Sequence, residues 1–179
     1  MGDILSYKQA VIDSMGYLGE DERTIFIGQG VLYPGLIFDT LIKVPKEKRL
    51  EVPVFEDTQL GICIGLSLEG YIPVCIFPRM DFLMCAMNQL VNHLDKIEYM
   101  SSNRFSPKVI IRTLVGATYP LDPGPQHCHD YTLTLQEAVE NIVVVQPPNP
   151  EILLILYKEA LREKGSYIII EDMLRERNA

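Results

Sequence analysis

Three side chains that can take part in chemistry follow three predicted strands. Glu56 comes directly after the extended run 50–55 and precedes a helix rich in small residues. Phe82 follows the apolar run 71–77, and His127 lies in a long loop after the fourth predicted strand. The carboxyl ends of parallel strands meet at one edge of a sheet, where open α/β sheets bind ligands. The sequence therefore predicts an acid, an aromatic ring and an imidazole around one crevice, without naming the ligand.

Simpler explanations exist for some of these residues. Glu56 also fits an ordinary acid in the first turn of a helix, where carboxylates are stabilising. The run His127-Cys128-His129 is compatible with a metal site, but two histidines need at least one further ligand and none has a helpful spacing. We therefore expect this chain to hold no metal. A nucleophilic role for Cys85 or Cys128 would require a base and an orienting group.

Apolar runs without alternation are separated by helical segments along the whole chain, which is typical of strands covered on both faces. This pattern predicts a doubly wound, mostly parallel six-stranded sheet with helices on both faces. Ser6 is a candidate N-cap for the first helix. The expected strands are 24–28, 50–55, 71–77, 109–111, 142–145 and 167–170, and the expected helices are one after Ser6, a short one within 32–42, and 58–68, 82–100 and 150–163.

The segment 114–131 differs from the rest because it is long, polar and rich in glycine and proline. Loops of that length inside a compact domain are usually functional. We expect it to contribute to the site together with His127.

Composition limits the class of protein. The 179 residues suit one domain, and the 47% hydrophobic and 22% charged residues indicate a globular fold. A net charge of −8 without a basic stripe argues against nucleic acid as a partner. No apolar run is long enough to span a membrane, and no signal peptide opens the sequence. The four cysteines are interpreted as small buried hydrophobic residues, which suits a reducing cytoplasm.

Beyond these patterns, the sequence resembles the beta subunit of the decarboxylating component of 2-oxo acid dehydrogenases. That subunit carries the pyrimidine-binding domain of thiamine-diphosphate enzymes, which transketolase shares. The similarity covers nearly the whole chain. It rests on Pro53-Val-Phe-Glu, Gly61, Gly65, Gly70, Pro73-Val-Cys-Ile-Phe, Asp81-Phe82, Asn88-Gln89, Asn92, Lys96, Tyr99-Met100-Ser101, Arg112 to Gly116 and Gln126-His127.

The resemblance implies thiamine diphosphate as the cofactor and a role for each of the three residues. Glu56 matches the glutamate that hydrogen-bonds N1′ of the aminopyrimidine and assists loss of the thiazolium C2 proton. Phe82 matches the aromatic residue that stacks on the pyrimidine. His127 matches the histidine that faces the substrate. Glu56 and His127 are therefore the expected catalytic residues, and Glu56 and Phe82 the expected cofactor contacts.

Several positions depart from the family pattern. Cys128 stands where the family usually has serine, and Gln29 stands where it usually has glutamate at the end of the first strand. The loop 120–125 is proline-rich and slightly longer. These changes leave the substrate open, either a 2-oxo acid or a ketose.

Length is the largest departure. We expect residues 1–179 to form a single pyrimidine-binding domain, with the family's C-terminal and diphosphate-binding domains missing. No Gly-Asp-Gly run with a downstream Asn-Asn pair occurs. Because Mg²⁺ needs carboxylate, amide and phosphate oxygens, it must be held by a partner chain.

The sequence thus predicts the pyrimidine-binding subunit of a split thiamine-diphosphate enzyme that decarboxylates a 2-oxo acid or transfers a ketol or acyl unit. We expect the chain to be inactive alone and to form a homodimer or a heterotetramer with a diphosphate-binding, alpha-type subunit. Two alternatives stay open. One is a non-catalytic assembly or regulatory subunit. The other is a flavodoxin-like binding module, for which residues 27–31 are a weak phosphate-loop candidate.

Overall fold

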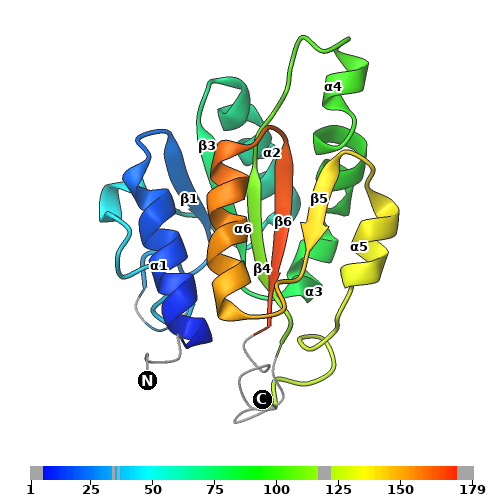
Figure 1. Cartoon of the computed structure of the whole chain (residues 1–179). Coiled ribbons are helices and arrows are strands. Elements are labelled where there is room, and N and C mark those ends of the chain that lie inside the picture. The colour runs from blue at the N-terminus through cyan, green and yellow to red at the C-terminus, as the bar shows by residue number, and fades with distance from the viewer. Residues whose placement is uncertain (1–5, 34, 36, 117–121, 173–179) are drawn as a thin grey trace.

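Six parallel strands form one sheet in the order β2-β1-β3-β4-β6-β5 (Figure 1). The computed structural model describes residues 6–33, 35, 37–116 and 122–172. Every neighbouring pair of strands is parallel, so the predicted fold class is confirmed. The strands are β1 (Thr24–Gly28), β2 (Arg49–Glu51), β3 (Ile72–Phe77), β4 (Ile110–Leu114), β5 (Ile142–Val145) and β6 (Ser166–Glu171).

Helices cover both faces of the sheet, and each face has its own hydrophobic core (Figure 1). Helices α1 (Tyr7–Glu20) and α6 (Pro150–Arg162) pack together on one face. The second core lies on the other face, under α2 (Glu56–Leu68) and α3 (Met80–Leu83). The turns η2 (Met84–Ala86) and η3 (Gln89–Leu94) extend this layer, which is completed by α4 (Ile97–Met100) and α5 (Thr132–Ala138).

Local capping explains where the helices of the first face begin. The Ser6 hydroxyl accepts a hydrogen bond from the Gln9 backbone N–H at 3.2 Å, as expected of an N-cap. Asn149 does the same for α6, with its Oδ1 2.8 Å from the Ile152 nitrogen. Pro150 then occupies the first helical position, where its missing N–H has no cost.

Four predicted strands have different bounds in the structure, and β3 and β6 differ by only one residue at an end. The larger differences are in β2 and β4. β2 ends at Glu51, because Pro53 cannot donate to the ladder, although the Val52 N–H still reaches the Gly28 carbonyl. β4 continues to Leu114 through Arg112 and Thr113, which are polar and yet almost fully buried. Their burial could not be read from an apolar pattern.

Two helix predictions were wrong and one helix was missed. The segment 37–44 forms turns, because Phe38 and Asp39 both have φ near 57°, a conformation that ends any helix. The expected long helix 82–100 is broken into α3, η2, η3 and α4, and η3 is a π-helical turn. Helix α5, after the polar loop, was not predicted.

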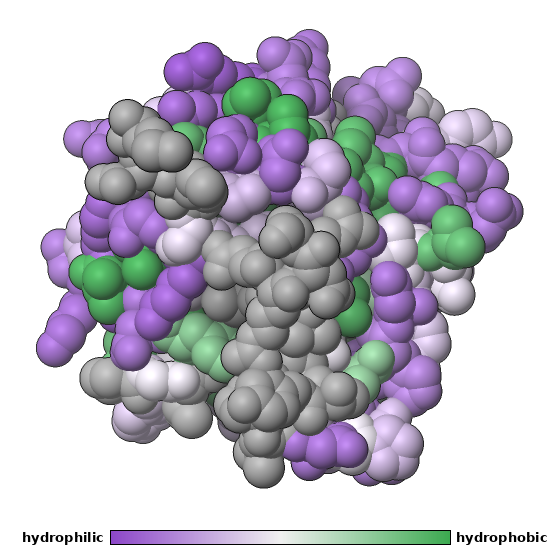
Figure 2. All heavy atoms as spheres, turned by 60° about the horizontal axis from the view of Figure 1, so that its bottom comes forward, coloured by the Kyte–Doolittle hydropathy of each residue, from purple (hydrophilic) through white to green (hydrophobic). Residues whose placement is uncertain are grey.

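The carboxyl ends of the strands lie at the bottom of Figure 1, and Figure 2 turns this edge toward the viewer. Hydrophobic side chains reach the surface there in separate patches among hydrophilic ones. Within the part of the chain that the structure describes, no helix is long and apolar enough to cross a membrane.

Candidate functional site

Phe82 and His127 meet at the carboxyl edge of the sheet. Phe77 at the end of β3 is in register with Thr113 of β4, so the segments that follow these two strands leave the sheet at the same level. The two rings are T-shaped, with centroids 5.5 Å apart and an interplanar angle of 86°. Both side chains are half-buried and keep an exposed surface. The predicted convergence of these two residues is confirmed.

Gly116, just beyond β4, holds the backbone of His127 in place. A Cβ at this position would overlap the His127 carbonyl oxygen and would lie 2.7 Å from an Arg79 Nη1 atom. Only glycine allows so close an approach of two backbone segments. The chain therefore leaves the sheet at Gly116 and returns to the same point at His127.

Glu56 is the first residue of α2, at the same edge, and it is half-buried. Gln59, three residues further along α2, donates from Nε2 to the Ile76 carbonyl at 3.0 Å, so the start of α2 lies over the end of β3. Asp57 accepts a hydrogen bond from Gln89 of η3 at 3.3 Å. The first turn of α2 is thereby tied to the strand before Phe82 and to the turn after it.

The structure does not join Glu56 to the other two residues. Among the described residues, no hydrogen bond or ring contact links Glu56 to Phe82 or His127. A ligand contacting all three would have to span the edge from α2 to the loop after β4. The simpler interpretation of Glu56 as a first-turn acid also fits its position, since Phe55 at the N-cap offers no side-chain hydrogen bond.

Gln29, where the family pattern has an acid, supports the segment that leads to Glu56. Its Nε2 donates to the Pro53 carbonyl at 3.0 Å and to Gln59 Oε1 at 2.8 Å. Gln59 is fully buried, so the two amides form a chain of hydrogen bonds from β1 through α2 to β3. Glu51 completes this region by accepting from the Gly30 and Leu32 N–H groups at 2.6 and 3.0 Å.

Sequence reasoning missed a side-chain hydrogen bond beside the Phe82–His127 contact. His129 Nδ1 lies 2.6 Å from Asp81 Oδ1, and its ring stacks on Tyr131 with centroids 5.2 Å apart. The sequence contained a signal, because His127, His129 and Tyr131 alternate and Asp81 precedes Phe82. No pattern in the sequence, however, relates two positions 48 residues apart.

Two polar atoms at this edge are buried without a hydrogen-bond partner among the described residues: Asp81 Oδ2 and His127 Nδ1. Buried polar atoms are normally paired, because an unpaired one loses its hydration without compensation. They therefore mark the point where a polar ligand group would be stabilised.

The cysteines fit the sequence interpretation only in part. Cys63 and Cys75 are buried, and a hydrogen bond between them, together with burial, raises the pKa of Cys63 well above its usual range. Cys128 is half-buried. Cys85 is exposed, so its interpretation as a buried hydrophobic residue was wrong.

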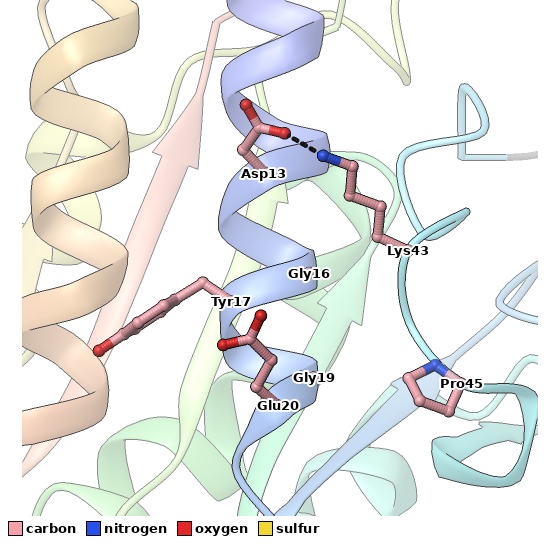
Figure 3. A pocket seen from close by; sticks show the side chains of 7 residues that line it. All are labelled: Asp13, Gly16, Tyr17, Gly19, Glu20, Lys43 and Pro45. Atoms are coloured by element: carbon pink, nitrogen blue, oxygen red, sulfur yellow. Dashed lines mark hydrogen bonds and ion pairs between the residues drawn. The ribbon is translucent and has the colours of Figure 1, made fainter.

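A pocket lies elsewhere, between α1 and the segment 43–45 (Figure 3). Its volume is about 480 Å³, and Lys43 crosses it to pair with Asp13 at 2.6 Å. That hydrogen bond lowers the pKa of the Asp13 carboxyl. The pocket lies on the α1 face, whereas α2 and α3 cover the opposite face, and its Lys43 is already paired with Asp13.

Fold and site together define an open parallel α/β domain with a candidate ligand-binding site at the carboxyl edge of its strands. The chain belongs to the family described as transketolase, pyrimidine binding domain, whose sequence model matches residues 5–174.

Curated relatives carry related names. The chain is 30% identical over 156 residues to a pyruvate dehydrogenase E1 component subunit beta, mitochondrial, of Ascaris suum, covering 85% of this chain and 42% of that protein. It is 25% identical over 177 residues to a 2-oxoisovalerate dehydrogenase subunit beta of Bacillus subtilis (strain 168), covering 94% and 52%. The chain thus spans about half the length of the curated relatives it matches.

A solved structure has the same fold. It is described as a split gene transketolase, inactive beta4 tetramer, and it matches with a TM-score of 0.74 over 94% of this chain and 51% of its own. The sequence identity is 18%, so this likeness concerns the fold alone.

Proposed function

We propose that this chain is the pyrimidine-binding part of a thiamine-diphosphate enzyme that decarboxylates a 2-oxo acid or transfers a ketol or acyl unit. The observation that carries the proposal is the Phe82–His127 contact at the edge where α2 begins with Glu56. It occurs within the range that the pyrimidine-binding family matches. The names of the relatives, which are beta subunits of 2-oxo acid dehydrogenases, support the same class of reaction.

The residues at this edge fit an aminopyrimidine. Such a ring needs a flat apolar surface and a carboxyl group at a ring nitrogen, and the half-buried Phe82 and Glu56 can supply them. An imidazole nitrogen of His127 that has no hydrogen-bond partner among the described residues is left for a further ligand group. No cluster of three or more histidine, cysteine or acidic residues able to hold a metal occurs in the described ranges.

In this proposal each residue has a separate task. When bound, thiamine diphosphate supplies the nucleophilic carbon that attacks a carbonyl. Glu56 exchanges a proton with N1′ of the pyrimidine and so controls the protonation state of that ring. Phe82 fixes the ring plane. His127, whose ring contacts Phe82 and whose backbone passes close to Gly116, would donate to or accept from the substrate.

A partner chain completes the proposed enzyme. We propose an alpha-type chain that binds the diphosphate and its Mg²⁺. This chain forms either a homodimer or a heterotetramer with that partner. The isolated chain should then bind thiamine diphosphate weakly or not at all. Calorimetry on the isolated chain checks this, and micromolar binding would contradict it.

The decisive experiment compares two adjacent acids of α2 in the assembled enzyme. Glu56→Gln should slow exchange of the C2 proton of thiamine diphosphate by about 10²- to 10⁴-fold, the usual cost of losing one positioned acid or base. Asp57→Asn is the matched control, because it removes a charge from the same first turn and should change the rate little. Exchange into deuterium oxide is followed by NMR.

The outcomes separate the proposed roles. Equal rates for Glu56→Gln and the wild type would make Glu56 an ordinary first-turn acid. They would favour the alternative of a non-catalytic assembly or regulatory subunit. A panel of 2-oxo acids and ketoses then identifies the substrate class.

A further inference from the structure

The returning loop segment 127–131 lies along α3 in a regular way. The His127 ring contacts the Phe82 ring, His129 pairs with Asp81, and the Tyr131 backbone N–H reaches the Met80 sulfur at 2.8 Å. Residues 127, 129 and 131 of the loop thus contact residues 82, 81 and 80 of α3, respectively. Alternation of this kind is what an extended segment produces, because successive side chains point to opposite sides.

The Asp81–His129 pair is a polar side-chain contact between this segment and α3. Asp81 is 9% exposed, and His129 is 50% exposed. An Nδ1–H of His129 donating to the carboxylate at 2.6 Å is a charge-assisted hydrogen bond, which is shorter and stronger than a neutral one. The Tyr131 ring stacks on the imidazole at an interplanar angle of 24° and restricts its rotation.

Asp130, which lies between two of these contact residues, bonds to α5 and not to α3. Asp130 accepts from the Thr132 N–H at 2.9 Å and from the Thr132 hydroxyl at 2.5 Å, so it belongs to the start of α5. On the other side, the His127 carbonyl lies so close to Gly116 that a Cβ there would overlap it. The backbone of His127 is therefore packed against Gly116, and the residue two positions later pairs with Asp81.

We propose that His129 is a positioning residue whose hydrogen bond to Asp81 holds His127 edge-on against Phe82. This inference rests on the proposed function in one respect, namely that His127 faces the substrate. His129 itself does not need to touch substrate in this arrangement, because its Nδ1 is occupied by Asp81. Without the pair, the half-buried His127 would keep the contact of its backbone with Gly116 but lose the orientation of its ring.

The composition of the chain makes a direct test possible. It has only three histidines, His93, His127 and His129. With histidine labelled with ¹³C at the ring Cε1 atom, each imidazole gives one ring C–H signal in the full-length chain. Single substitutions assign all three signals. The His127 signal should be displaced by the adjacent Phe82 ring, and Phe82→Leu measures how large that displacement is.

His129→Leu should abolish most of that displacement, because leucine cannot bond to Asp81. His129→Asn should retain it, since the asparagine amide can donate from nearly the position of Nδ1. His93→Leu is the matched control, on the exposed side of η3, and should leave the His127 signal unchanged. An unmoved His127 signal in His129→Leu would overturn the proposal.

Folding is checked by circular dichroism in every variant. Should His129→Leu fail to fold, Asp81→Asn carries the same test, because it preserves the shape of the side chain and removes its charge. Asp81→Asn is then expected to move the His127 signal part of the way toward its position in Phe82→Leu. No movement would again refute the role of the pair.

Turnover in the assembled enzyme provides the functional arm. His129→Leu should lower kcat by about 10- to 100-fold, as expected from a displaced reacting group, with C2 proton exchange unchanged and with recovery in His129→Asn. Normal turnover in a variant whose His127 signal has moved would overturn the positioning role. The NMR arm needs neither cofactor nor partner, so it stays decisive if thiamine diphosphate proves not to bind.

Discussion

Gly116 allows the His127 carbonyl to approach closely because it has no side chain. In Gly116→Ala, the new methyl group would overlap the His127 carbonyl oxygen, and the loop would have to shift. We expect the free energy of unfolding to fall by about 1–3 kcal/mol, the usual cost of overpacking. Turnover should fall about 10- to 100-fold, since a displacement of about 1 Å can have that effect. Urea unfolding and steady-state kinetics measure the two quantities.

Gly65 is the matched control for this change. It lies in α2 and has no atom within 4 Å of an added Cβ, so Gly65→Ala should raise stability by up to about 1 kcal/mol through helix propensity. A Gly116→Ala protein as stable and active as the wild type would show that the loop relaxes freely, and that the close approach has no positioning role.

His127 can be separated from Glu56 by the step that each affects. His127→Ala removes a ring that contacts Phe82 at its edge, and it leaves Glu56 and the start of α2 untouched. We expect C2 proton exchange at the wild-type rate and a loss of about 10²- to 10⁴-fold in turnover, the range for one acid or base. Parallel exchange and turnover assays check this. Exchange slowed as much as in Glu56→Gln would place both residues in one step.

Single residues differed in how far the sequence could predict them. Glu56, Phe82 and His127 were found because each follows a strand, and parallel strands bring such positions to one edge. The Asp81–His129 pair and the Gln29–Gln59 amides were not found, because hydrogen bonds between side chains of distant segments leave no periodic pattern. The resemblance supplied the roles, and the structure supplied the contacts.

At the level of elements, α2 is anchored to the sheet by one buried amide. Gln59→Met preserves the length of the side chain but leaves the Ile76 carbonyl without this donor and Gln29 without one acceptor. We expect a loss of about 1–3 kcal/mol in the free energy of unfolding, because a buried polar group becomes unpaired. Gln136→Met is the control, since Gln136 is exposed and donates to Val144 at 3.2 Å. Equal losses in urea unfolding would contradict the anchoring role.

The elements themselves were predicted best where the sequence has an unbroken apolar run or a regular amphipathic helix. The bounds of β1 and β5 agree with the prediction, and those of α6 differ by one residue. The prediction failed where the backbone departs from regular geometry, at the positive φ angles of Phe38 and Asp39 and at the π-helical turn η3. Apolar spacing cannot distinguish such turns from a regular helix, because the side chains that they bury are the same.

In the whole molecule, a buried ion pair connects the central strands with the helices of one face. Arg112 of β4 forms two hydrogen bonds with Glu171 of β6, both 2.9 Å, and Glu171 also accepts from the Tyr157 hydroxyl of α6 at 2.7 Å. At the start of α1, the Tyr7 hydroxyl accepts from the Asp172 N–H at 3.0 Å. The network thus joins both ends of the described chain to the centre of the sheet.

The two tyrosines of this network link stability to alkaline pH. Burial raises the pKa of Tyr157 and of Tyr7 above the usual range, and the negative charge of Glu171 raises both further. In the unfolded chain these phenols lose their protons near about pH 10. The folded state keeps them protonated, so their contribution to stability is complete below about pH 10 and is lost as pH rises toward the folded pKa.

We therefore expect the free energy of unfolding to fall steeply above about pH 10 and to fall less steeply in Tyr157→Phe. The variant loses a hydrogen bond to Glu171, so its stability at neutral pH is lower, by about 1.5–3 kcal/mol, and the slope with pH is the informative quantity. Tyr99→Phe, on a side chain that is 85% exposed, is the control and should keep the wild-type slope. Urea unfolding at a series of pH values measures both. Identical slopes in Tyr157→Phe and the wild type would mean that the pKa of the Tyr157 phenol is the same in the folded and the unfolded chain. Tyr157 would then have no part in the alkaline response.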